Sequence, residues 1–278
     1  MINYNSLVKK WADELDLYEI QEAQNLVEWL LEHHLGLRRV DMMHFLDEKD
    51  LPKALIDDFS RLKTGEPIQQ IIGKAPFYGR EFFVSKDTLI PRNETEELVH
   101  LIIKENPQIG LKILDIGTGT GCIPITLSLE MKNAEVFATD ISEAALEIAR
   151  KNAQELHTSV QFVKSDILNE EIPIEGLDIL VSNPPYIPIH EKSSMHTNVV
   201  DFEPGLALFV PNEDPLLFYR KIAEAGKKAI KHGGRLYFEI HENFGKAVKD
   251  LLLEMNYSKA EIIQDLNGKD RIVRACMN

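Results

Sequence analysis

The first 73 residues carry apolar side chains at helical spacing. Over residues 20–31 the apolar positions recur at steps of three and four, which places them on one face of a helix. A second stretch of this kind covers residues 51–62 and ends just before Gly65 and Pro67, which is typical of a helix stop. Because this region holds no catalytic constellation, we expect residues 1–73 to form a small helical domain that docks the substrate.

The pattern then changes to short β-prone runs. Phe77 and Tyr78 precede Gly79, and a second β-prone run follows at residues 82–84. Two such runs around a glycine predict a hairpin. Residues 74–93 are therefore interpreted as a β-hairpin connector.

From residue 94 to residue 278 apolar strands alternate with helical patterns. The expected strands are residues 111–116, 135–139, 160–163, 177–182, 235–240, 260–263 and 271–275. A helical pattern at residues 142–156 separates the second strand from the third. This alternation predicts an α/β domain whose sheet is mostly parallel and covered by helices on both faces.

Charge and cysteine content narrow the class of protein. The 278-residue chain has a formal net charge of -14, which argues against a protein that binds nucleic acid by neutralising phosphates. It has two cysteines, Cys122 and Cys276, too few for a disulfide scaffold. No apolar leader or membrane-length segment is evident, so a cytoplasmic protein is expected. Nine histidines are scattered without metal-ligand spacing, and no metal is expected.

A glycine-rich loop follows the first strand of the α/β domain. The loop contains Gly117, Gly119 and Gly121, and glycine lets a backbone adopt positive φ and approach a ligand closely. Open α/β sheets bind cofactors at this edge, beyond the carboxyl ends of their strands. Nicotinamide- and flavin-binding folds share such loops, and a tight turn without a ligand is a further alternative.

Three acidic residues near strand ends favour S-adenosyl-L-methionine as the cofactor. Asp140 ends the second strand, where a carboxylate can accept hydrogen bonds from both hydroxyls of a ribose. Asp115 lies two residues before the first glycine, facing the amino-acid and sulfonium end, and Asp166 follows the third strand, within reach of the adenine amine. The loop also has the spacing G-x-G-x-G, unlike the G-x-G-x-x-G of dinucleotide folds.

The sharpest chemical signal is the tetrapeptide Asn183–Tyr186, directly after the fourth strand. An amide nitrogen is a poor nucleophile because its lone pair is delocalised into the carbonyl. The side-chain oxygen of Asn183 and the backbone carbonyl of Pro184 can accept its two N–H groups and hold it in line with a methyl donor. The fixed φ of proline keeps that carbonyl rigid.

These roles make Asn183, Pro184 and Tyr186 the candidate catalytic residues, with Tyr186 stacking on the flat amide and excluding water. Fixed dipoles at this position would also stabilise charge growing on the nitrogen. The alternative is a Pro-Pro loop that only ends a strand.

A run of polar residues before the helix near residue 94 has two interpretations. Arg92, Glu94 and Glu96 either line the entrance to the site or belong to a helix start, where acids interact favourably with the helix dipole. The sequence leaves both open.

Together these motifs resemble the peptide chain release factor glutamine methyltransferases, the HemK/PrmC family, over nearly the whole chain. The stretches that carry the resemblance are residues 65–73, 77–79, 89–96, 115–121, 182–187, 203–208 and 270–273. The resemblance implies a class I, Rossmann-like methyltransferase with seven strands in a mostly parallel sheet. It also implies that the enzyme methylates the glutamine of the Gly-Gly-Gln motif in class I release factors, leaves S-adenosyl-L-homocysteine as product, and is a monomer.

The resemblance also assigns residues by position. The implied cofactor-binding residues are Gly117, Thr118, Gly119, Thr120, Gly121, Asp140, Ile141, Ile167 beside Asp166, and Asn183. The implied glutamine-binding residues are Asn183, Pro184, Pro185 and Tyr186. The chain departs from the family pattern at Asn93, where proline is usual, at Ile167, where an aromatic residue is frequent, and at His241. The loop between Tyr186 and Glu203 is long enough to act as a lid.

Two other functions compete with this one. Methyltransferases that act on exocyclic amines of adenine or cytosine in nucleic acid share the tetrapeptide, because the planar nitrogen poses the same problem. Such an enzyme is expected to carry a basic face or a target-recognition insert, and neither is evident here. A non-enzymatic binding module would have disabled catalytic positions, whereas Asn183 and Tyr186 are both present.

Overall fold

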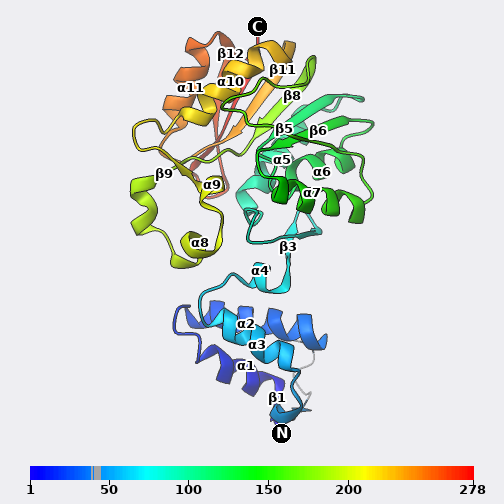
Figure 1. Ribbon diagram of the computed structural model, residues 1–278, viewed down its shortest axis with the longest axis vertical. Coiled ribbons are helices and arrows are strands. Elements are labelled where there is room, and N and C mark those ends of the chain that lie inside the picture. The colour runs from blue at the N-terminus through cyan, green and yellow to red at the C-terminus, as the bar shows by residue number, and fades with distance from the viewer. Residues whose placement is uncertain (39, 41–44) are drawn as a thin grey trace. The chain divides into compact units, whose positions relative to one another are not determined.

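The computed structural model describes residues 1–38, 40 and 45–278, whose contacts divide the chain into two units (Figure 1). Unit 1 comprises Met1–Lys74 and His196–Phe202, and unit 2 comprises Ala75–Met195 and Glu203–Asn278. The chain therefore leaves unit 2 after the tetrapeptide, contributes a short segment to unit 1 and returns. No described helix is both long and apolar enough to cross a membrane.

Helices make up most of unit 1. They are α1 (Tyr4–Ala12), α2 (Ile20–Leu35), α3 (Lys53–Leu62), α4 (Ile68–Ile72) and α8 (Thr197–Phe202), with the short elements β1 (Ile2–Asn3), β2 (Phe45–Leu46) and η2 (Glu48–Asp50). The helices predicted at residues 20–31 and 51–62 are α2 and α3, which confirms the helical interpretation of this region.

The apolar faces of these helices share one core. Trp11 stacks on Phe59 with ring centroids 4.2 Å apart, and Leu30 of α2 is fully buried. The Gln70 side chain of α4 donates a hydrogen bond to the carbonyl of Phe202 at 2.9 Å. This bond fastens α8 to unit 1, an arrangement for which the sequence carried no signal.

Unit 2 is built on a seven-stranded sheet of order β12-β13-β11-β8-β5-β6-β7. Its strands are β5 (Lys112–Ile116), β6 (Glu135–Asp140), β7 (Gln161–Lys164), β8 (Leu177–Ser182), β11 (Ile230–Glu239), β12 (Tyr257–Gln264) and β13 (Asp270–Met277). The five strands from β11 to β7 are parallel, and β13 is antiparallel to both of its neighbours. Each of the seven predicted strands corresponds to one of these, which confirms the predicted fold class.

Helices cover both faces of the sheet. Successive strand residues point to opposite faces, so an apolar strand presents side chains that must be buried on each face. In β8, Leu180 packs toward α10 and α11, whereas Ile179 and Val181 pack toward α5 and α6. The remaining elements of unit 2 are α5 (Asn93–Glu105), α6 (Cys122–Glu130), α7 (Glu143–Glu155), β9 (Ile187–Pro188), η3 (Ile189–Ser194), α9 (Gly205–Leu208), β10 (Phe209–Val210), α10 (Leu217–Ala229) and α11 (Gly245–Glu254).

The predicted hairpin is formed by β3 (Lys74–Phe77) and β4 (Arg80–Phe83), which pair in a small sheet of their own. Tyr78 and Gly79 make the turn with φ of 49° and 72°, as a two-residue hairpin loop requires.

The strand order determines where a ligand can bind. β5 comes first in the chain among the strands of this sheet and lies in its interior. The strands that follow it in sequence, β6 and β7, are added on one side of β5, and β8 is added on the other. The loops after β5 and β8 therefore diverge at the carboxyl edge and leave a crevice between them. The Ser182 hydroxyl at the end of β8 donates a hydrogen bond to the Ile116 carbonyl at 2.7 Å, which fixes the two strand ends together.

Candidate functional site

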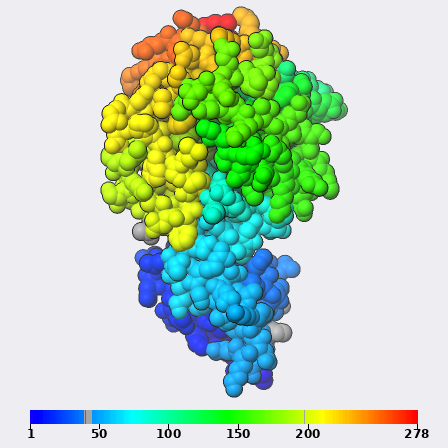
Figure 2. All heavy atoms as spheres, viewed as in Figure 1, coloured from blue at the N-terminus to red at the C-terminus, as the bar shows by residue number. Residues whose placement is uncertain are grey.

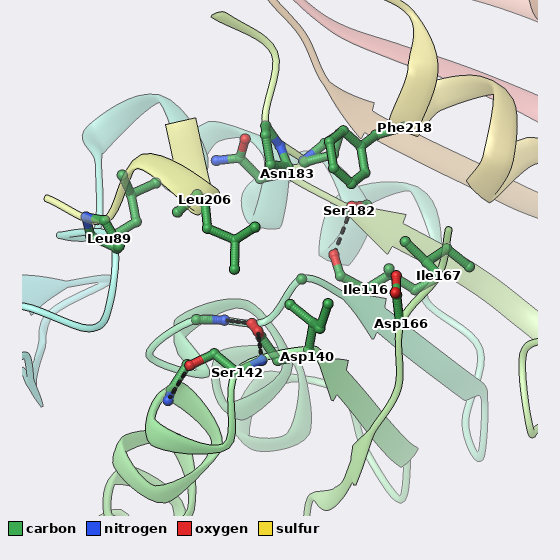
Figure 3. A pocket seen from close by; sticks show the side chains of 18 of the residues that line it. Leu89, Ile116, Asp140, Ser142, Asp166, Ile167, Ser182, Asn183, Leu206 and Phe218 are labelled. Atoms are coloured by element: carbon green, nitrogen blue, oxygen red, sulfur yellow. Dashed lines mark hydrogen bonds between the residues drawn. The ribbon is translucent and has the colours of Figure 1, made fainter. Parts of the chain in front are cut away.

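A cavity of about 220 Å³ opens at this edge of unit 2 (Figure 3). The loops that follow β5, β6, β7 and β8 all contribute to its lining. The other walls are residues 87–89, Ala145 of α7, the three residues Pro204, Leu206 and Ala207, and two residues of α10, Phe218 and Ile222. In Figure 2 the yellow surface of the chain after Glu203 borders the green surface of the first half of the sheet.

The three glycines of the loop after β5 have different structural roles. Gly117 and Gly119 line the cavity with φ of 75° and 53°, and a Cβ atom built on either would meet nothing within 4 Å. A Cβ on Gly121 would lie 3.0 Å from Ile125 and 3.1 Å from Ala149. The first two glycines therefore leave room for a ligand against the backbone, and the third lets helices α6 and α7 approach each other.

Asp140 lies at the end of β6 and faces this loop (Figure 3). Its two carboxylate oxygens accept backbone hydrogen bonds, one from Gly119 and one from Ser142, each at 2.9 Å. Burial raises the pKa of Asp140, and these two hydrogen bonds oppose that rise. Each oxygen keeps a second lone pair, so the side chain is held in place and still able to accept a pair of hydroxyl groups.

The loop after β7 supplies the wall beside Ile116. Asp166 and Ile167 both line the cavity, as does Ile141 after β6. The Asp166 carboxylate accepts hydrogen bonds from the backbone of Leu168 at 3.0 Å and from the side chain of Asn169 at 2.7 Å. These local bonds orient Asp166 at the cavity's edge.

Asp115 is placed differently from the other acids. It is fully buried beneath the glycine loop, and neither of its oxygens has a hydrogen-bond partner of ordinary geometry among the residues that the structure describes. Burial raises the pKa of Asp115 to about 7, while the nearby Thr118 hydroxyl lowers it and Asp140 raises it further. Asp115, Thr118, Thr120 and Gly121 do not line the cavity, so the loop's backbone, and not these side chains, forms the cavity surface.

The tetrapeptide after β8 forms the side of the cavity that faces Asp140 (Figure 3). Asn183, Pro184 and Pro185 line it, with Pro184 buried. Tyr186 is not part of the lining. Its hydroxyl lies 3.4 Å from the Glu239 carboxylate, and its ring packs edge-on against the His241 ring with centroids 6.0 Å apart. The structure therefore brings Asn183, Pro184 and Pro185 to the cavity and places Tyr186 behind them.

A buried polar network supports Asn183 from behind. The Asn183 side-chain nitrogen donates to the Thr95 hydroxyl at 3.3 Å, and this hydroxyl donates to the Glu239 carboxylate at 2.7 Å. Burial raises the pKa of Glu239 to about 7, although the Thr95 hydrogen bond and Arg271 lower it.

Sequence reasoning missed Thr95 and Glu239 as site residues. The only hint was that Thr95 lies in the polar run at residues 92–96. That run forms the start of α5, with Glu94 and Glu96 in the first turn.

A second network joins two walls of the cavity. The buried Glu203 carboxylate accepts a hydrogen bond from the backbone of Ile90 at 3.0 Å and pairs with the Arg92 guanidinium. The cavity-lining residues that flank this network were not predicted as site residues, although Leu89, Pro204, Leu206 and Ala207 lie within stretches that carry the family resemblance.

The cavity fits S-adenosyl-L-methionine by the chemistry of its lining. The glycine backbone leaves an open cradle, Asp140 offers paired acceptors suited to a ribose, and Ile141 and Ile167 offer apolar surface suited to a flat base. Asn183 lies on the side of the cavity opposite Asp140, where an acceptor substrate has room beside the methyl donor (Figure 3). Pro184 follows it in the lining.

Comparison with family models and solved structures agrees with this description. Residues 93–202 match a model described as the methyltransferase small domain, and residues 6–73 match one described as the PrmC N-terminal domain. A methyltransferase from Pyrococcus furiosus has a similar fold, with a TM-score of 0.53 at 18% identity over 79% of this chain and 98% of that one.

Curated relatives match over nearly the full length. The release factor glutamine methyltransferase of Bacteroides thetaiotaomicron is 45% identical, covering 94% of this chain and 95% of the relative. The enzyme of the same name from Flavobacterium psychrophilum is 43% identical over 93% of each chain. The one from Staphylococcus aureus is 40% identical over 98% of this chain and 99% of the relative.

Proposed function

The chain belongs to the family of release factor glutamine methyltransferases, and we propose that it methylates the side-chain amide nitrogen of the Gly-Gly-Gln glutamine in a class I release factor. One observation carries the proposal at the level of the site. Asn183 and Pro184 line the same cavity as Gly117, Gly119 and Asp140, so an amide can be held where the methyl donor is bound.

When bound, S-adenosyl-L-methionine supplies an electrophilic methyl group on a sulfonium sulfur that leaves as a neutral thioether. Gly117, Gly119 and Asp140 hold the nucleoside and its ribose, with Ile141 and Ile167 beside the base. Asn183 adjoins both ligands.

Asn183 and Pro184 act on the glutamine. The Asn183 side-chain oxygen and the Pro184 carbonyl accept one N–H each, which aims the nitrogen lone pair at the methyl carbon. The carbon–nitrogen bond forms as the carbon–sulfur bond breaks, and the sulfur keeps the electron pair. The two oxygens stabilise the positive charge that grows on nitrogen, and the methylated nitrogen then loses a proton to water. No base has to remove a proton before transfer.

For Tyr186 we propose a positioning role in place of the stacking on the amide that the sequence suggested. Its ring packs behind the cavity lining and its hydroxyl points to Glu239, so it shapes the position of the tetrapeptide. Burial, chiefly, raises the pKa of Tyr186, with Glu239 adding to the rise, and the phenol stays neutral.

The test uses the purified chain, methyl-labelled cofactor and a recombinant class I release factor. The expected result is label on the Gly-Gly-Gln glutamine, located by tandem mass spectrometry, and none on a release factor in which that glutamine is alanine. Label at another site, or transfer to an adenine or cytosine amine in nucleic acid instead, would reject the substrate assignment. The -14 net charge favours the protein substrate.

Substitution separates substrate orientation from cofactor binding. Asn183→Ala is expected to lower kcat about 100-fold or more, as loss of one oriented polar group does in other active sites. Affinity for S-adenosyl-L-homocysteine should remain measurable. Asn267→Ala, at an exposed turn, is the matched control. Equal loss of turnover and product binding in Asn183→Ala would show that the site is assigned wrongly.

We also expect the enzyme to be a cytoplasmic monomer that does not bind nucleic acid directly. Gel filtration with light scattering tests the oligomeric state. An electrophoretic shift assay with RNA and duplex DNA tests nucleic-acid binding.

A further inference from the structure

We propose that Thr95 and Glu239 determine which way the Asn183 side-chain amide faces, and that this presents its oxygen to the substrate glutamine. The inference rests on the proposed function and adds two positioning residues to it. They come from α5 and β11, elements that neither the glycine loop nor the tetrapeptide belongs to.

The hydrogen-bond chain has one direction. An ionised Glu239 carboxylate only accepts hydrogen bonds, so the single hydrogen of the Thr95 hydroxyl is committed to it, 2.7 Å away. The Thr95 oxygen can then only accept from Asn183, 3.3 Å away, which requires the NH2 end of that amide. The Asn183 oxygen is left for the ligand.

The opposite orientation would disable the site. A rotated Asn183 would turn its own NH2 group toward the NH2 group of the glutamine, placing donor against donor. The nitrogen lone pair would then lose one of the two acceptors that aim it at the methyl group. Turnover therefore depends on the direction of a hydrogen-bond chain that does not itself touch substrate.

Burial makes the hydrogen bonds between Asn183, Thr95 and Glu239 strong enough to fix the orientation of the Asn183 amide. Thr95 is 3% exposed and Glu239 is 1% exposed, so water has no room to replace either partner. The Tyr186 hydroxyl donates to the other Glu239 oxygen at 3.4 Å, which satisfies that oxygen and leaves the first oxygen to Thr95. Hydrogen bonds in such surroundings are costly to leave unmade.

The experiment compares Thr95→Val with Thr95→Ser. Valine keeps the shape but removes the hydroxyl, and we expect kcat to fall about 10- to 100-fold, the range that loss of a buried, oriented hydrogen bond produces. The KM for cofactor and the affinity for S-adenosyl-L-homocysteine should change less than about threefold, because neither depends on Asn183 orientation. Serine restores the hydroxyl and should recover kcat to within about threefold of the wild type.

Two further variants make the comparison decisive. Thr126→Val is the matched control, since Thr126 is fully buried in α6 and its hydroxyl makes no hydrogen bond among the described residues. It should leave kcat unchanged. Glu239→Met keeps Thr95 and the length of the side chain at 239 but removes both carboxylate oxygens. The Thr95 hydrogen can then turn to the Asn183 oxygen, and kcat should fall about tenfold. This variant carries the test if Thr95→Val does not fold.

Full kcat in Thr95→Val or Glu239→Met would overturn the inference while leaving the proposed function intact. Equal losses in Thr95→Val and Thr95→Ser would also overturn it, because packing and not the hydroxyl would then be responsible. Failure of the wild-type chain to label the release factor glutamine would overturn the proposed function, and this inference with it.

Discussion

The carboxylate of Glu203 accepts a hydrogen bond from the backbone N–H of Ile90 at 3.0 Å, although the two residues are 113 positions apart. The same carboxylate pairs with Arg92 and is 5% exposed. Residues 87–89 on one side of this contact and Pro204, Leu206 and Ala207 on the other line the cavity. One buried side chain therefore holds together two walls of the cofactor site.

Replacing Glu203 should loosen those walls. In Glu203→Gln one of the two donors, the Ile90 N–H or the Arg92 guanidinium, would face the NH2 end of the new amide. A buried hydrogen bond to a charged group contributes about 1.5–3 kcal/mol, and we expect roughly a tenfold loss of S-adenosyl-L-homocysteine affinity. Isothermal titration calorimetry measures this loss. Glu213→Gln, at an exposed acid, should not change the affinity. Unchanged binding in Glu203→Gln would mean that the walls are held by other contacts.

Asp140 should contribute most to cofactor affinity. Its oxygens are fixed by Gly119 and Ser142, each at 2.9 Å, and their remaining lone pairs are free for ribose hydroxyls. Asp140→Ala removes two charge-assisted hydrogen bonds, so binding of S-adenosyl-L-homocysteine should weaken about 100-fold or more. Asp140→Asn should also bind poorly, since one backbone N–H would then meet an NH2 group. Near-normal affinity in Asp140→Ala would place the ribose elsewhere.

Turnover should rise with pH as Glu239 ionises. Burial raises the pKa of Glu239 to about 7, so its protonated form predominates below neutrality. A protonated Glu239 can donate to Thr95, which releases the Thr95 hydrogen to the Asn183 oxygen. We therefore expect kcat at saturating substrates to fall as the pH drops through about 7, to a plateau about tenfold lower, and to level off above it.

The neighbours of Glu239 decide where this step falls. The titratable and charged groups around it are Glu94, Cys122, Tyr186, Tyr219 and Arg271. The pKa of Asp115 is also raised to about 7, so the wild-type profile alone does not identify the group. The Glu239→Gln variant identifies the group, because the step in kcat should disappear in Glu239→Gln and persist in Asp115→Asn. A Glu239→Gln profile with the wild-type step would assign the step to another group.

Much of the fold followed from local patterns in the sequence. Each strand of the seven-stranded sheet is an apolar run that its own residues reveal, and helices α2 and α3 show helical spacing of their own. The carboxyl-edge location of the glycine loop and of Asn183 also followed, because both come directly after predicted strands. Parallel strands bring such loops to one edge whatever their separation in the chain.

The hydrogen bonds between Asn183, Thr95 and Glu239 could not be predicted from the sequence, because they join positions that are distant in the chain. Thr95 and Glu239 are 144 residues apart, and neither has a local pattern that distinguishes it from a helix-start threonine or a strand-end glutamate. The position of Tyr186 behind the lining, edge-on to His241, likewise depends on how the segment after β11 packs. Side-chain hydrogen bonds of this kind are fixed only once the sheet order is known.

The last prediction concerns stability. Asp115 is fully buried without a hydrogen-bond partner of ordinary geometry among the described residues, and burial raises its pKa from 3.8 to about 7. Between these two values the folded chain holds a proton that the unfolded chain has released, so the free energy of unfolding should fall as pH rises through this window. The fall approaches about 1.4 kcal/mol per pH unit and stops above about pH 7. Glu239 adds a loss of the same sign.

Asp115→Asn removes the Asp115 share of this loss. Urea unfolding of the cofactor-free chain between pH 5 and 8 should therefore show a smaller loss of stability in Asp115→Asn than in the wild type, by a few kcal/mol across the range. Asp16→Asn, at an exposed position, should keep the wild-type dependence. If Asp115→Asn loses as much stability as the wild type, then Asp115 is already ionised in the folded chain above pH 5 and does not contribute to the loss.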